Sequence, residues 1–286
     1  MAPPNDSHQE VPIAHLPREL LADITRSISD FTVGFVKLRE TSAGRDAVLL
    51  GSGTLVRIGA IRAILSAHHV VERLPRIGRF GLILSRREHD YTLDVAGVYR
   101  LKIGRGAIDI EGPDLAAVLL SSQIGSTLAG MKSFYDLESR QDSMLRTPPD
   151  RRSGIWANVG FVGERTVDEP GRSGFQTIKR FAMLGGFGGP ERGPTVRGRF
   201  DYIAMPATYG GESVAPLSFG GMSGGGLWQI LLRQDARGML STVDHLLSGV
   251  VFYQTQRQGD RREVICHGPQ SVYSAALEAI SNGAAP

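Results

Sequence analysis

The chain has 286 residues, and its content of 41% apolar and 21% charged residues excludes a fully disordered protein. Its 36 glycines and 15 prolines follow no G-X-Y period, which excludes a collagen, and no apolar run is long enough for a membrane-spanning helix. The net charge is +3 at pH 7, and the basic residues are scattered, whereas nucleic-acid-binding domains gather them on one element. We therefore expect no membrane and no nucleic-acid partner.

The first predicted element is a short helix near the N-terminus. Residues 1–15 are polar and rich in proline, which is typical of a tail. Residues 16–28 place leucine and isoleucine at helical spacing, which predicts an amphipathic helix. Together they form an N-terminal appendage over residues 1–29, whose helix we expect to pack on the body of the protein.

A first series of strands is predicted between residues 30 and 140. Runs rich in β-branched and apolar residues, separated by turn-forming residues, are typical of strands. These runs lie at residues 31–40, 47–58, 61–71, 81–85, 94–103 and 115–122. They predict a first antiparallel β-barrel over residues 30–140.

A polar stretch at residues 136–153 separates this series from a second one, which predicts another antiparallel β-barrel over residues 141–267. Residues 185–199 are rich in Gly, Pro and Arg without periodicity, and we interpret them as a mobile loop. A short C-terminal helix is expected in residues 268–286. Long helices alternating with strands are absent, which argues against a doubly wound α/β fold. The strands of the second series are predicted at residues 155–163, 177–184, 199–205, 225–232 and 246–254.

The cysteine content and the N-terminal residues indicate the cellular compartment. The single cysteine, Cys266, cannot form an internal disulfide. Residues 1–17 lack the basic-then-apolar layout of a secretory signal. A cytoplasmic location is therefore expected.

Residues 219–226, FGGMSGGG, give the strongest local signal of chemistry. A nucleophilic serine needs close approach of a substrate carbonyl and backbone N–H groups that face the developing oxyanion. Glycines on both sides permit this geometry, because they tolerate positive φ and place no side chain in the way. The alternative is a glycine-rich turn between two strands.

Two other segments supply candidate partners for that serine. Residues 65–71, LSAHHVV, bring histidine to the end of a predicted strand. Residues 112–120, GPDLAAVLL, place Asp114 at the entrance of an apolar strand, where an uncompensated carboxylate is costly. A structural histidine and a turn aspartate after Gly-Pro are the alternatives.

Taken together, the three segments resemble the chymotrypsin/trypsin-fold serine proteases, particularly their disulfide-free bacterial HtrA-like branch. LSAHHV is similar to that family's LTAAHV, PDLAAVLL to its DLAVL, and GMSGGG to its GxSGG. The similarity covers roughly residues 30–280 and keeps the family's order of His, Asp and Ser. It implies an all-β fold of two six-stranded antiparallel β-barrels.

The resemblance implies a role for each matched residue. Ser223 would attack a carbonyl carbon, His69 would take and return its proton, and Asp114 would orient His69 and stabilise its imidazolium form. The backbone N–H groups of Gly221 and Ser223 would form the oxyanion hole. His68 competes with His69, but it stands where the family usually has alanine, so His69 is preferred.

The sequence departs from the family's pattern at the activation and substrate positions. Met222 stands where trypsin-like zymogens have the aspartate that pairs with a newly cut N-terminus, so activation by that ion pair is not expected. Leu217 stands at the pocket floor and cannot anchor Arg or Lys, so we expect a small or apolar P1 side chain. The other pocket residues that the resemblance implies are Phe252, Tyr253, Gln254 and Ser271.

The sequence thus predicts a cofactor-independent serine endopeptidase that acts on protein or peptide substrates. We expect an activating protein partner, or ordering of the 185–199 loop, to switch it on. A catalytically silent trypsin-like binding scaffold is the alternative. An α/β-hydrolase-type esterase, with Asp244 or Asp260 and His267, is less favoured because the glycines after Ser223 start a helix poorly. No set of residues shows zinc-ligand spacing, so no metal is expected.

Overall fold

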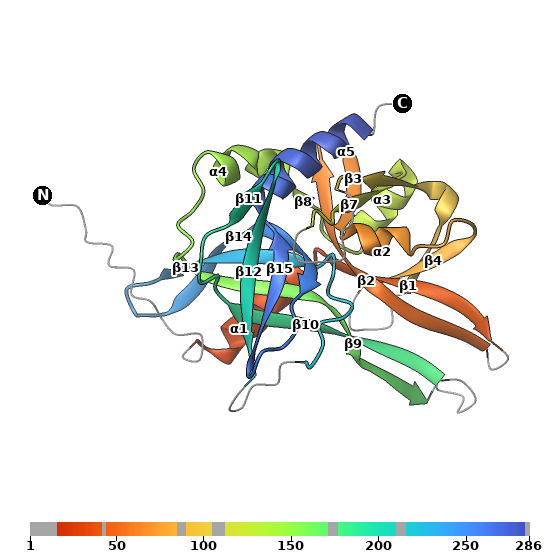
Figure 1. The fold of residues 1–286 in the computed structure, drawn as a ribbon, viewed down its shortest axis with the longest axis horizontal. Helices are drawn as coiled ribbons and strands as arrows, with labels where there is room; N and C mark the ends of the chain where they lie inside the picture. The colour runs from red at the N-terminus through yellow and green to blue at the C-terminus, as the bar shows by residue number, and fades with distance from the viewer. Residues whose placement is uncertain are drawn as a thin grey trace, which may run out of the picture.

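The computed structural model describes residues 16–41, 44–84, 90–104, 112–170, 177–209 and 216–283, and the predicted tail over residues 1–15 lies outside these ranges. Two antiparallel β-sheets form the body of the protein, and short helices lie around them (Figure 1). The all-β fold class predicted from the strand runs is confirmed.

The first sheet has eight strands, in the order β5-β4-β1-β2-β3-β7-β6, and β8 also pairs with β2. All pairs are antiparallel except the short parallel pair of β8 with β2. The prediction of six strands was too low, because a short segment after β4 and the linker itself each add a strand. The bounds are β1 (Thr32–Thr41), β2 (Gly44–Ile58), β3 (Ile61–Ser66), β4 (Arg79–Ile83), β5 (Asp90–Asp94), β6 (Val98–Lys102), β7 (Ala116–Leu120) and β8 (Tyr135–Asp136).

The second sheet has seven strands rather than six, in the order β10-β9-β13-β14-β15-β12-β11. The prediction that residues 185–199 form a loop was wrong in part. The long strand β10 continues to Gly188, and β11 forms a hairpin with β12. The bounds are β9 (Ile155–Pro170), β10 (Thr177–Gly188), β11 (Thr195–Arg197), β12 (Phe200–Thr208), β13 (Gly226–Gln234), β14 (Leu240–Gln254) and β15 (Arg261–His267).

Helical segments connect or cover the sheets. The N-terminal helix α1 buries Ile24 and Ile28 and contacts β1, β9 and β14, so it packs on the body as expected. Within the described ranges, no helix combines the length and apolar character needed to cross a bilayer. The helical bounds are α1 (Arg18–Ser29), α2 (His68–Glu72), α3 (Ser122–Ala129), α4 (Gln141–Leu145) and α5 (Leu277–Gly283), with the 3-10 turns η2 (Val95–Gly97) and η3 (Glu138–Arg140) and the π-helical segment η4 (Ser271–Ala276).

The two sheets share one hydrophobic core. Trp228 on β13 is fully buried, and its ring centroid lies 5.2 Å from that of Phe31 and 5.2 Å from that of Tyr135, both from the first half of the chain. Burial of each such aromatic side chain contributes about 2–3 kcal/mol. This packing fixes the position of one sheet against the other, and therefore the position of any site at their seam.

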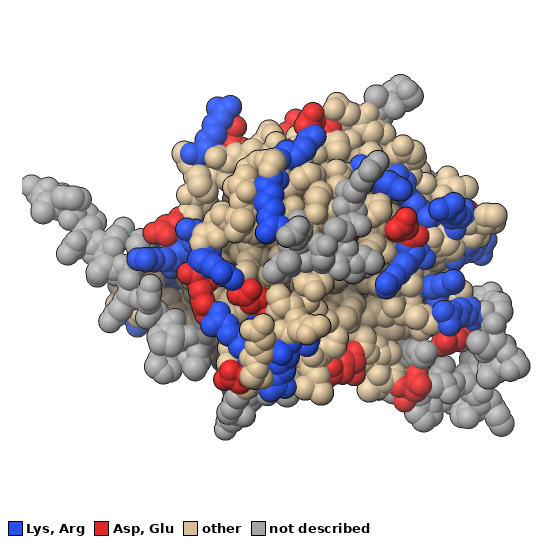
Figure 2. All heavy atoms as spheres, viewed as in Figure 1, with Lys and Arg blue, Asp and Glu red and all other residues tan. Residues whose placement is uncertain are grey.

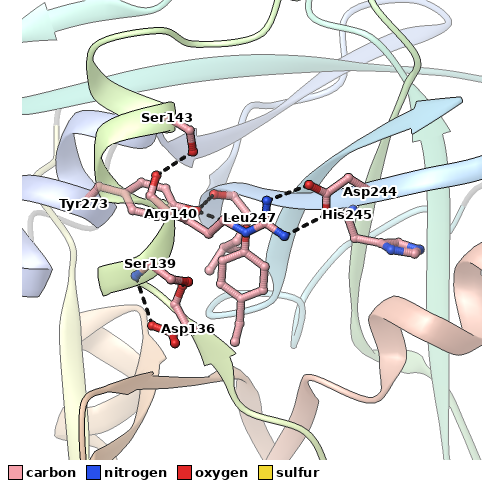
Figure 3. A network of polar contacts seen from close by, with 9 residues as sticks. Asp136, Ser139, Arg140, Ser143, Asp244, His245, Leu247 and Tyr273 are labelled. Carbon is pink, nitrogen blue, oxygen red and sulfur yellow. Dashed lines mark hydrogen bonds and ion pairs between the residues drawn. The ribbon is translucent and has the colours of Figure 1, made fainter.

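A polar network ties the linker and the C-terminal helical segment to the second sheet (Figure 3). The guanidinium of Arg140 in η3 donates to both carboxylate oxygens of Asp244 on β14, at 2.6 and 3.0 Å. The hydroxyl of Tyr273 in η4 donates to the carbonyl of Leu247 at 2.8 Å, and burial raises the pKa of Tyr273. The chain between the sheets is thus held at a defined place on β14.

Candidate active site

The pairing of β3 with β7 brings two of the candidate residues together. Ser66, the last residue of β3, pairs with Ala116, the first residue of β7. The chain after Ser66 turns at once into the short helix α2, which contains His69, whereas Asp114 lies two residues before β7. The antiparallel register therefore places the histidine beside the carboxylate.

Asp114 holds His69 through two hydrogen bonds. One carboxylate oxygen accepts the backbone N–H of His69 at 2.9 Å, and the other lies 2.5 Å from its Nδ1. The Asp114 side chain is 1% exposed, so its charge is compensated chiefly by these contacts. A carboxylate at Nδ1 fixes the tautomer that carries hydrogen there and leaves Nε2 as a proton acceptor. His68, the competing histidine, starts the same helix and faces elsewhere.

A further histidine, His267, supports the Asp114 backbone. Its Nε2 accepts the backbone N–H of Asp114 at 3.1 Å. Burial lowers the pKa of His267 to about 4, so the ring is neutral at pH 7, as this acceptor role requires. Its ring centroid lies 4.5 Å from that of Phe252. Neither the residue type nor the spacing of His267 indicates this role. The hydrogen bond from Asp114 also excludes His267 as the free histidine of an esterase.

Ser223 lies in the loop that precedes β13, between two glycines with backbone conformations that other residue types rarely adopt. Gly221 has φ of +99° and Gly224 has φ of +93°, both in the left-handed region. A Cβ on Gly224 would lie 1.9 Å from the carbonyl oxygen of Ser52. The strand that follows rules out the esterase alternative, since its nucleophile must open a helix.

Ser52 on β2 fastens this loop to the first sheet. Its N–H donates to the carbonyl of Ser223 at 2.8 Å, and its hydroxyl donates to the carbonyl of Gly221 at 2.7 Å. The same hydroxyl accepts the N–H of Phe161 on β9 at 2.8 Å. Strand β2 thus joins the serine loop to both sheets. The sequence did not indicate this arrangement.

Two backbone N–H groups of the serine loop, one of them that of Ser223 itself, have no acceptor among the described residues. From Phe219 to Gly225, the described hydrogen bonds leave the N–H groups of Gly221 and Ser223 unoccupied. These are the two donors that the sequence analysis assigned to an oxyanion hole. The other five donate to Gln254 Oε1 (from Phe219), Ser218 Oγ (from Gly220), and the carbonyls of Phe219 (from Met222), Val251 (from Gly224) and Met222 (from Gly225).

Contacts link Ser223 to the His69–Asp114 pair. The Ser223 hydroxyl donates to the carbonyl of Phe252 at 3.3 Å, the Phe252 ring packs on His267, and His267 accepts from Asp114. The structure therefore brings the three predicted side chains into one region at the seam of the sheets. The hydrogen bond between the Ser223 hydroxyl and His69 is not formed in this conformation.

The predicted pocket residues Leu217 and Gln254 lie together at one end of β15. The guanidinium of Arg262 donates to the carbonyl of Leu217 at 2.7 Å and to Oε1 of Gln254 at 2.8 Å. The Gln254 side chain also donates to Ser218 Oγ at 3.2 Å, so it crosses from β14 to the loop. Leu217 is 65% exposed, which corrects its expected place at a buried floor.

Ser271 and Phe252 were also expected in the pocket, and the structure corrects the first of them. Ser271 is fully buried, and its N–H and hydroxyl bond to Asp201 at 2.7 and 2.8 Å. It follows the His267 end of β15, whereas Arg262 and Leu217 lie at the opposite end. Phe252 is 1% exposed and presents its carbonyl to Ser223, while its neighbour Tyr253 is partly buried.

Metal ligation finds no support in the described part of the chain, where no three His, Cys, Asp or Glu side chains form a group that could hold an ion. Cys266 is fully buried, and burial raises the pKa of its thiol.

Comparisons with known proteins give little further guidance. No protein-family model matches the chain, and no curated protein sequence matches it. A solved structure from work on the coupled folding and binding of the intrinsically disordered Sesbania mosaic virus VPg protein is similar at 16% identity. The match covers 87% of this chain and 90% of that chain, with a TM-score of 0.44. A similarity at this level supports no assignment of family or activity.

Proposed function

We propose that the chain is a trypsin-like serine endopeptidase that hydrolyses peptide bonds through an acyl-enzyme. The observation that carries the proposal is the coincidence of three features at one place. These are a histidine held by a buried carboxylate, a serine hydroxyl in a glycine-rich loop, and two backbone N–H groups of that loop that have no acceptor among the described residues. The curved antiparallel sheets are consistent with a trypsin-like fold.

The proposed reaction has two symmetrical halves. Ser223 Oγ attacks the substrate carbonyl carbon while its proton moves to Nε2 of His69, and the carbonyl electrons move onto oxygen. The resulting oxyanion accepts hydrogen bonds from the N–H groups of Gly221 and Ser223. The C–N bond then breaks, and His69 gives the proton to the leaving amine. Water repeats these steps on the acyl ester and restores the free serine.

The groups around the triad supply orientation and charge stabilisation. An oxyanion-hole donor is worth about 3 kcal/mol of the activation barrier. Asp114 stabilises the imidazolium that forms at His69 during each proton transfer. Ser52 contributes by holding the carbonyl of Gly221 at 2.7 Å, which limits rotation of the peptide unit that lies between those of the two donors.

Activation is proposed to depend on a protein partner. The thioether of Met222 offers no carboxylate to pair with a newly cut N-terminus. The residue is 1% exposed and packs in an apolar cluster instead. The hydroxyl of Ser223 must leave the carbonyl of Phe252 to reach His69. A partner or substrate that binds the main chain at Phe252 would displace the hydroxyl, since both compete for the same carbonyl oxygen.

The proposed substrate is a protein or peptide with a small or apolar P1 side chain. The Gln254 side chain joins β14 to the loop at Ser218, and such a bridge narrows the substrate space between β14 and this loop. Leu217, next to Ser218 in the same loop, adds an exposed apolar side chain to this space. A cytoplasmic site of action is part of the proposal, because the single cysteine is buried as a free thiol.

A catalytically silent binding scaffold is the second candidate function. The observation that favours it is the Ser223 hydroxyl, which bonds to Phe252 and not to His69. Proteome-wide mapping of new N-termini, with the wild-type protein against Ser223→Ala, separates the two candidates. An endopeptidase produces a set of termini that the variant does not. Identical termini from both proteins, at equal concentration and with cell lysate as a source of partners, would favour the scaffold.

A further inference from the structure

A small hollow lies between α2 and β6, on the helix that carries His69. Its volume is about 150 Å³, well below the roughly 300–1,000 Å³ of pockets for drug-sized ligands, so any occupant is small. Figure 2 shows basic side chains gathered on the side of the molecule that carries α2 and β4 in Figure 1. The residues that line the hollow are His68, Val71, Glu72, Arg76, Arg100 and Lys102.

The lining carries an excess of positive charge. Arg76, Arg100 and Lys102 contribute three cationic groups, against the one carboxylate of Glu72. Among the residues that the structure describes, none of the three cations is neutralised by an ion pair. These three cations and one carboxylate leave an excess of two positive charges, which is opposite and equal to the charge of a dianion.

Arg100 is held in a fixed orientation toward this space. Its guanidinium donates to the carbonyl of Leu74 at 3.0 Å and also to the carbonyl of Pro75. A guanidinium has five N–H donors, so three remain for a ligand. Burial and the neighbouring Arg76 both lower the pKa of Arg100, because each disfavours the positive charge of its guanidinium. A bound anion would relieve this repulsion.

His68 adds unused hydrogen-bonding capacity to the wall. The residue is 8% exposed, and its Nδ1 has no hydrogen-bond partner. Buried polar atoms of this kind are rare, because an unsatisfied donor or acceptor costs about 1–3 kcal/mol. The ring stands next to His69 in the same short helix, so an occupant of the hollow would contact the helix that positions His69.

We propose that the hollow binds a phosphate group, as inorganic phosphate or as a small phosphate monoester. Arg100 supplies the oriented donors, Arg76 and Lys102 supply long-range attraction, and Val71 limits the size of the ligand. Planar guanidinium groups match phosphate oxygens in geometry and charge. A bound phosphate would join β6 to α2 and stabilise the helix. Any effect on turnover rests on the proposed peptidase function, whereas the binding itself does not.

The test is a titration with inorganic phosphate followed by calorimetry and by thermal unfolding, against sodium chloride of equal ionic strength. We expect saturable binding of one phosphate per chain and a rise in Tm that chloride does not reproduce. Phenyl phosphate as a second ligand separates recognition of the free ion from that of an ester. Acetate should bind at least tenfold more weakly, since it carries one charge, and equal binding of acetate would overturn the phosphate assignment.

Variants locate the site. The double substitution Arg76→Ala and Lys102→Ala should weaken phosphate binding by about tenfold or more, because two of the three cationic groups that attract the anion are lost. Arg73→Ala is the matched control, because Arg73 is exposed in the same segment but does not line the hollow. Glu72→Gln should strengthen binding, which a misfolded protein could not do. Absence of saturable binding, or equal losses in the control and the double variant, would refute the site.

Discussion

The hydroxyl of Ser223 donates a hydrogen bond to the carbonyl oxygen of Phe252, 3.3 Å away. A hydroxyl carries one proton, so Ser223 cannot donate to His69 at the same time. Rotation about the Cα–Cβ bond releases the hydroxyl from this carbonyl, and staggered rotamers of serine interconvert readily. The proposed peptidase therefore rests with its nucleophilic hydroxyl bound to a main-chain carbonyl.

Asp114→Asn should lower kcat by about 10⁴ while leaving the fold intact, because an amide cannot fix the required tautomer of His69 or stabilise its cation. Steady-state hydrolysis of a peptide identified by terminus mapping measures the effect. Asp244→Asn, which alters a carboxylate away from His69, is the control and should keep kcat within about twofold. Equal activity of Asp114→Asn and wild type would remove Asp114 from the mechanism.

Ser52→Ala should lower kcat by about tenfold with little change in KM. The substitution leaves the carbonyl of Gly221 and the N–H of Phe161 without their partner, which costs about 2 kcal/mol of stability and loosens the serine loop. The separation of kcat from KM distinguishes positioning from a general loss of folded protein. Ser241→Ala removes an exposed hydroxyl on the second sheet and should leave both constants unchanged.

His267 should make stability depend on pH. Burial holds its pKa at about 4, below the roughly 6.5 of an unfolded chain, so between these values only the unfolded chain binds the proton. Its contribution is complete above about pH 6.5 and is lost as pH falls toward 4, by about 2 kcal/mol between pH 7 and pH 5. Urea unfolding at both pH values measures it. His267→Gln, whose side chain can still accept from Asp114, should lack that part of the pH dependence.

Gly224→Ala should destabilise the protein by about 3 kcal/mol or more, since its Cβ would lie 1.9 Å from the Ser52 carbonyl oxygen at a positive φ. Gly186→Ala is the matched control, because a Cβ there meets nothing within 4 Å. Urea denaturation of the two variants compares their free energies of unfolding. A Gly224→Ala protein as stable as the control would contradict the described loop geometry.

The sequence predicted the features that depend on local pattern. Alternating apolar runs located most strands, and the glycines around Ser223 indicated a tight loop that the structure realises with positive φ at Gly221 and Gly224. Residues 185–199 were misinterpreted because glycine has low strand propensity. There, pairing with β9 supplies the backbone hydrogen bonds, as in the pair of Gly186 with Asn158.

Other features depend on contacts between distant parts of the chain and leave no local trace. His267 bonds to a residue 153 positions away, and Ser52 bonds to one 169 positions away. Neither residue type nor spacing distinguishes them from ordinary strand residues. Ser271 was placed in the pocket by the family resemblance alone. Its actual partner, the buried Asp201 of β12, comes close to it only through tertiary packing, so the sequence could not indicate it.

Covalent labelling with a fluorophosphonate tests the central claim most directly. Such a reagent reacts with a serine hydroxyl only when a nearby base accepts the proton and donors stabilise the oxyanion. Peptide mass spectrometry should find one adduct, on Ser223, in the wild-type protein, and none in Ser223→Ala or His69→Ala. Absence of an adduct on Ser223, with and without cell lysate or peptide substrate, would contradict the assignment of this seam as an active site.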